Sequence, residues 1–187
     1  MYCQKMMKII MQYTKNIIPS FNTIKPSICR LINKNMPKDI EEISELPDDS
    51  PYYYTERGDK FMAYKSEKIV LLISKFQAQL IYSNQDHMFL DGTFYSAPKS
   101  GYQILSVRIH DIKENNFYIV ANAILLGKEM SKYIEVFMKL NEIIFDNREN
   151  KRILECFSPR TIHCGFELGI IGGLKQVWPN SEIKLCL

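Results

Sequence analysis

The feature that most constrains the fold is a change of hydrophobic pattern after residue 126. Before it, three apolar segments at about 88–94, 102–110 and 116–126 have the length and pattern of β-strands. After it, apolar residues recur at helical spacing from Tyr133 to Ile144. A short strand at about 160–164, a helix from Phe166 to Val177 and a last strand from Glu182 follow. The predicted order of elements is β-β-β-α-β-α-β.

This order predicts an α/β fold of the α+β type, with a mixed sheet and helices packed on it. The first three strands are expected to be antiparallel neighbours. The strand at about 160–164 should lie parallel to the first, which would bring Asp91 and Gly165 together at one end of the sheet. Hydrophobic residues make up 46% of the 187, enough for one sizeable core.

The preceding part of the chain divides into two segments. Residues 1–50 are predicted to be a partly disordered lead-in, basic and then acidic, with a short helix near 39–45. Prolines at 19, 26, 37 and 47 are expected to break any longer helix. Residues 51–82 are interpreted as a lead-in hairpin packed on the main domain, with strands at 61–64 and 69–73 joined by polar residues.

Positive charge is concentrated at the start of the chain. Seven basic side chains and one acidic one give residues 1–40 a formal charge of +6, which leaves −3 for the remainder of a chain whose total is +3. A basic segment on a weakly acidic body favours a polyanion partner, although many basic segments bind nothing. The sequence therefore suggests non-specific DNA contact through residues 1–40.

The cysteines and the apolar segments indicate the cellular compartment in which the protein is expected. The five cysteines, at positions 3, 29, 156, 164 and 186, include no Cys-x-x-Cys pair, which favours reduced thiols over a disulfide framework. No apolar run approaches the roughly 20 residues that span a bilayer. We expect a nuclear or cytoplasmic protein without a membrane segment.

The segment Phe89-Leu90-Asp91-Gly92-Thr93-Phe94 is the most informative motif. Read alone, Asp91-Gly92 is also typical of a tight turn. With the landmarks that follow it, the segment resembles the transposase domain of Mutator-like elements (MULE). Those landmarks are Ala97-Pro98, Tyr102-Gln103, Ala123-Ile124-Leu125-Leu126, Tyr133 with Phe137 and Leu140, Gly165-Phe166-Glu167, Trp178-Pro179-Asn180 and Leu185-Cys186-Leu187. Upstream, Phe61-Met62-Ala63-Tyr64 and Ile69-Val70-Leu71-Leu72 resemble the lead-in strands of animal members associated with FLYWCH-type zinc fingers.

The resemblance implies a ribonuclease-H-like fold and metal-dependent cut-and-paste DNA transposition, with transposon ends as the bound DNA. Such chemistry uses two Mg²⁺ or Mn²⁺ ions held by carboxylates. Asp91 matches the first of three acids and is the expected catalytic and metal-binding residue. Gly165 stands at the second position, and the third acid lies on a helix beyond Leu187. Residues 83–187 are therefore expected to be a C-terminally incomplete catalytic domain.

These substitutions predict a chain without cutting activity. Glu167 is a possible additional metal ligand, although an acid in the first turn of a helix is also explained by the helix dipole. Two alternatives stay open: a transposase-derived, non-enzymatic DNA-binding or regulatory protein, and an active nuclease that relies on Asp91 and Glu167. Gly169, Gly172 and Gly173 inside the last helix should each cost about 1 kcal/mol relative to alanine, which favours a degenerate domain.

Overall fold

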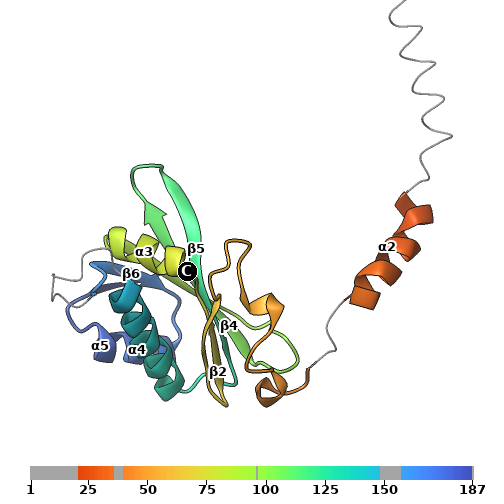
Figure 1. Cartoon of the computed structure of the whole chain (residues 1–187). Coiled ribbons are helices and arrows are strands. Elements are labelled where there is room, and N and C mark those ends of the chain that lie inside the picture. The colour runs from red at the N-terminus through yellow and green to blue at the C-terminus, as the bar shows by residue number, and fades with distance from the viewer. Residues whose placement is uncertain (1–20, 36–39, 96, 148–156, 187) are drawn as a thin grey trace, which may run out of the picture. The chain divides into compact units, whose positions relative to one another are not determined.

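The computed structural model of the chain describes residues 21–35, 40–95, 97–147 and 157–186. It divides into two compact units, Met1–Asp39 and Ile40–Leu187. The second unit contains a mixed seven-stranded sheet with helices packed on it (Figure 1). The predicted mixed-sheet α/β class is confirmed at this level.

The strands of the sheet lie in the order β1-β2-β5-β4-β3-β6-β7. Neighbours from β1 to β3 are antiparallel, whereas β6 and β7 continue the sheet parallel to β3. The three antiparallel strands and the parallel fourth strand of the prediction are therefore present. The bounds are β1 Met62–Lys65, β2 Ile69–Leu72, β3 His87–Thr93, β4 Gln103–Asp111, β5 Asn116–Leu125, β6 Thr161–Cys164 and β7 Glu182–Leu185.

The helices α3 (Lys75–Ser83), α4 (Met130–Asn147) and α5 (Leu168–Val177) lie together on one face of this sheet (Figure 1). The main hydrophobic core fills the space between that face and the helices. Alternate residues of β4, such as Leu105 and Val107, are fully buried in it, and Trp178 closes it after α5. Since the side chains of a strand alternate between faces, the residues between them point to the opposite face.

Part of that opposite face is covered by the segment that precedes β1. Ile43, from the short 3₁₀ helix Ile43–Glu45, and Tyr53, from the 3₁₀ helix Pro51–Tyr53, form a second cluster with Met62 and Val70. The predicted short helix near 39–45 corresponds to the first of these turns. The division drawn at residue 50 from the sequence lies inside the second compact unit, because Ile43 is part of its packing.

Helix α3 was not predicted, because residues 51–82 were interpreted as a hairpin alone. A local signal for it exists at Ser74 and Gln77. The Ser74 hydroxyl accepts a hydrogen bond from the Gln77 amide at 3.3 Å, and the Gln77 side chain accepts one from the Ser74 amide at 2.8 Å. This reciprocal capping box satisfies two backbone donors at the start of the helix.

Helix α2 (Phe21–Asn35), in the first unit, corrects the expectation that prolines exclude a long helix there. It has 15 residues and contains Pro26 in its second turn. The missing N–H of a proline removes one intrahelical hydrogen bond, but the bonds on either side can persist. Lys25 and Arg30 are exposed on this helix. Much of the predicted DNA-binding and disordered segment, at 1–20 and 36–39, lies outside the described residues.

Candidate functional site

The residues expected to carry the chemistry lie where β3 and β6 end. In the parallel pairing of these strands, Leu90 is the partner of Cys164, so Asp91 and Gly165 follow as neighbours at the same end of the sheet. Asp91 and Gly92 lie within β3, paired with Ser106 and Leu105 of β4. The alternative interpretation of Asp91-Gly92 as a tight turn is therefore wrong.

Asp91 is exposed to solvent, and Arg108 on β4 is its ionic partner. The Asp91 carboxylate lies 3.9 Å from the Arg108 guanidinium, and the two side chains are 61% and 45% exposed. An exposed ion pair of this length contributes at most about 1 kcal/mol to stability. The carboxylate is therefore free to exchange this partner for another cation.

Gly165 is exposed next to Asp91 and leaves room beside it. A Cβ atom built on Gly165 would have no heavy atom within 4 Å outside its own chain neighbours. The position therefore accepts a larger side chain without displacing described residues. Glycine itself supplies no side-chain ligand for a metal.

Glu167, which precedes α5, lies in a hydrogen-bonded cluster with Tyr133 of α4 and Gln103 of β4. Its Oε1 contacts the Tyr133 hydroxyl, and its Oε2 accepts from Gln103 Nε2 at 3.2 Å. The Tyr133 hydroxyl also lies 2.6 Å from Gln103 Oε1. Burial, together with the Glu167 carboxylate, raises the pKa of the Tyr133 phenol above its usual value. Both oxygens of Glu167 are thus engaged by protein groups.

Gly92 explains how this cluster fits against β3. A Cβ atom on Gly92 would collide with the Gln103 amide and come within 3.5 Å of the Glu167 carboxylate. Gly92 therefore faces the helices, and Asp91, the preceding residue of the strand, faces the other side. The two acids named from the sequence are not brought together. Asp91 and Glu167 lie on opposite faces of the sheet.

Metal binding at this end of the sheet depends on the side chains that converge there. Carboxylate oxygens are the ligands that Mg²⁺ and Mn²⁺ prefer, and Asp91 is the acid on its face that the sequence analysis named. Across the four described ranges, no group of three or more His, Cys, Asp or Glu side chains is arranged to hold a metal ion.

Two members of the Glu167 cluster were not recognised as such from the sequence. Gln103 and Tyr133 are both fully buried, but each was considered only as a landmark or a core residue. A signal for Gln103 exists. It shares the buried face of its strand with Leu105, Val107 and Ile109, and a buried amide requires hydrogen-bond partners.

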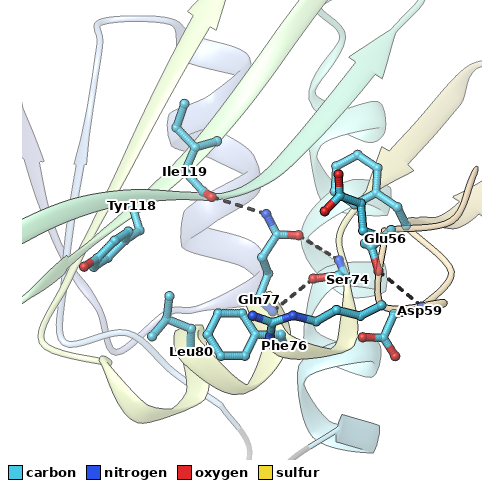
Figure 2. Close-up of a pocket in the computed structure, with 11 residues that line it drawn as sticks. Glu56, Asp59, Ser74, Phe76, Gln77, Leu80, Tyr118 and Ile119 are labelled. Atoms are coloured by element: carbon cyan, nitrogen blue, oxygen red, sulfur yellow. Dashed lines mark hydrogen bonds between the residues drawn. The ribbon is translucent and has the colours of Figure 1, made fainter. Parts of the chain in front are cut away.

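A pocket of about 450 Å³ lies elsewhere, between α3, the start of β5 and the turn at residues 55–59 (Figure 2). Its apolar residues include Phe76 and Leu80, and the Arg57 guanidinium lies 5.5 Å above the centre of the Phe76 ring. Gln77 bridges from α3 to the carbonyl of Ile119 at 3.3 Å. Asp91, Gly165 and Glu167 do not line it.

Comparisons with known proteins leave the family unassigned. The chain matches no family model, and no curated protein matches it at a significant level. Among the described helices, none is both long and apolar enough to cross a membrane.

Proposed function

We propose that this chain is a DNA transposase domain of the Mutator-like kind, with a ribonuclease-H-like fold and an incomplete cutting site. The observation that carries the proposal is the register of two neighbouring parallel strands, in which Asp91 and Gly165 directly follow the last pair, Leu90 with Cys164. In the family that the sequence motif resembles, two of the three catalytic acids stand at these positions. The sheet order β5-β4-β3-β6-β7, in which β4 alone runs antiparallel to β3, also supports the proposal.

The proposed loss of cutting follows from ligand chemistry. Two-metal phosphoryl transfer needs carboxylates that hold two ions roughly 4 Å apart, so that both the attacking and the leaving oxygens are stabilised. Gly165 offers no oxygen, and the Glu167 carboxylate is engaged by Tyr133 and Gln103 on the other face. Mg²⁺ gives up its water reluctantly, and Asp91 by itself supplies too few ligands to hold the pair.

A plasmid assay tests this proposal. Purified chain is incubated with supercoiled DNA and Mg²⁺ or Mn²⁺, beside an Asp91→Ala variant. We expect no conversion of supercoiled to nicked DNA above the level of the variant. Metal-dependent nicking that is abolished by Asp91→Ala would contradict the proposed loss and would favour the active nuclease that relies on Asp91 and Glu167.

A second candidate is a non-enzymatic DNA-binding or regulatory protein derived from such a transposase. The formal charge of +6 over residues 1–40 favours it, as do Lys25 and Arg30, which are exposed on α2. Both candidates place the protein in the nucleus or the cytoplasm with DNA as its partner. A tagged copy that accumulates in the nucleus and associates with chromatin would favour the regulatory candidate, whereas exclusion from the nucleus would count against it.

A further inference from the structure

Two of the chain's three histidines face each other on the sheet surface opposite the helices. His87 opens β3 and His163 is the third residue of β6, the parallel neighbour of β3. Their side chains are half-buried, and His87 Nδ1 lies 3.2 Å from His163 Nε2. His87 lies four residues before Asp91 on β3, and His163 lies opposite Phe89, two residues before Gly165 on β6.

The ring of His163 is held in place by two further contacts. It stacks on Phe89 with a centroid distance of 4.4 Å and an interplanar angle of 10°. Its second nitrogen, Nδ1, lies 4.0 Å from the sulfur of Cys186. A proton on Nδ1 directed at this sulfur leaves the lone pair of Nε2 facing His87. The sulfur would then take the place of the carboxylate, carbonyl or water that commonly orients the ring of a metal-binding histidine through its second nitrogen.

We infer that His87 Nδ1 and His163 Nε2 form a binding site for one divalent transition-metal ion of the zinc class. Two nitrogen ligands of a tetrahedral zinc, each at about 2.0–2.1 Å from the metal, lie roughly 3.3 Å apart. The observed separation of 3.2 Å fits this geometry without movement of either strand. Imidazole suits Zn²⁺, Cu²⁺ and Ni²⁺ and is a poor ligand for Mg²⁺.

The site has open coordination positions. In the part of the chain that the structure describes, no third His, Cys, Asp or Glu side chain joins the pair to complete a metal site. A zinc ion held there would take its other ligands from water, and it would have one protein ligand fewer than open zinc sites with three. The inference does not depend on the proposed transposase function, because it concerns different residues and a different class of metal.

The test is isothermal titration of the whole reduced chain with ZnCl₂ in a non-chelating buffer. His87→Gln and His163→Gln each remove one ligand. His110→Gln is the matched control, because His110 lies on the same face, stacks on Phe117 and contacts Asn115 instead of a second histidine. We expect one Zn²⁺ per wild-type chain and per His110→Gln chain, and at least about tenfold weaker binding in the other two variants. Circular dichroism confirms that the variants are folded.

Two further measurements identify the ligands. Cys186→Ala should weaken Zn²⁺ binding less than His87→Gln does, and the Co²⁺-loaded chain should show no sulfur-to-metal charge-transfer band. Zn²⁺ binding that survives in His87→Gln, or is equally weak in the wild type and both ligand variants, would overturn the inference. A charge-transfer band that disappears in Cys186→Ala would overturn it as well, because it would assign the metal to the thiolate.

Discussion

At the scale of single residues, the cluster of Tyr133, Gln103 and Glu167 joins two helices to the sheet. Each of the three contacts depends on the packing of α4 and α5 over β4. A buried polar group that loses its partner costs more than the bond itself contributes, because the remaining group stays desolvated. The cluster is therefore expected to matter for stability as well as for the orientation of Glu167.

Tyr133→Phe should lower the free energy of unfolding by about 1–3 kcal/mol, because the Gln103 carbonyl and the Glu167 carboxylate lose the one hydroxyl donor that they share. Urea denaturation measures this change. Tyr54→Phe is the control, since the Tyr54 hydroxyl bonds Asp49 at an exposed position, and it should cost less than about 0.5 kcal/mol. Equal losses in the two variants would contradict the assigned role of the cluster.

The raised pKa of Tyr133 also predicts a pH dependence. In the folded chain, burial and Glu167 hold the phenol neutral above its ordinary value of 10.0. The unfolded chain therefore loses this proton first as the pH rises. The contribution of Tyr133 to stability should be complete below about pH 10 and decline above it. Denaturation midpoints measured from about pH 8 to about pH 11 should fall less steeply in Tyr133→Phe than in the wild type, and parallel curves would contradict this.

At the scale of elements, the sequence predicted the strands and helices from β3 to β7 because their apolar residues repeat with a clear period. It did not predict α3, where the nine-residue helix has only a capping box as its signal. Nor did it show that two of the three glycines of α5 pack closely against another helix. Cβ atoms at Gly169 and Gly173 would lie 2.9 Å and 3.1 Å from Tyr133 of α4.

Alanine substitutions at two of these glycines are therefore expected to have different effects on the free energy of unfolding. Gly169→Ala should destabilise the protein by about 1–3 kcal/mol, because the new methyl would also lie 2.7 Å from the backbone oxygen of Lys128. Gly172→Ala should be neutral or stabilise by up to about 1 kcal/mol, because it would meet only the movable Met130 side chain. Thermal and urea unfolding of the two variants compares them directly. Stabilisation of both variants would instead favour the interpretation from the sequence, in which these glycines mark a degenerate domain.

At the scale of the whole molecule, the directions of β6 and β7 followed from the order of elements, since βαβ connections place successive strands parallel, and the place of β6 beside β3 was expected from the family resemblance. The neighbouring positions of Asp91 and Gly165 were predicted on this basis and are confirmed by the register of β3 and β6. The separation of Asp91 from Glu167 could not be predicted. It depends on which face of the sheet each side chain takes, and a shift of one residue reverses that face.

The charge of residues 1–40 makes a prediction for the full-length chain. Changing their seven basic residues to glutamine should weaken DNA binding at low salt by at least about tenfold, because fewer counterions are released from the phosphates. Fluorescence anisotropy with duplexes of unrelated sequence measures the affinity and its salt dependence. An unchanged isotherm would place the DNA contacts elsewhere or exclude them.

The measurement that most directly tests the central claim is Mn²⁺ binding by a Gly165→Asp variant. The claim is that the ends of β3 and β6 form a carboxylate metal site that lacks its second acid. The structure leaves room for the new side chain beside Asp91, and Mn²⁺ favours oxygen ligands. Titration followed by electron paramagnetic resonance compares the wild type, Gly165→Asp and the double variant Gly165→Asp with Asp91→Ala.

We expect Gly165→Asp to bind Mn²⁺ at least about tenfold more tightly than the wild type, a gain of about 1.4 kcal/mol. The added Asp91→Ala change should remove that gain. Affinity equal to that of the wild type, or a gain that persists without Asp91, would contradict the claim that these two positions form one metal site.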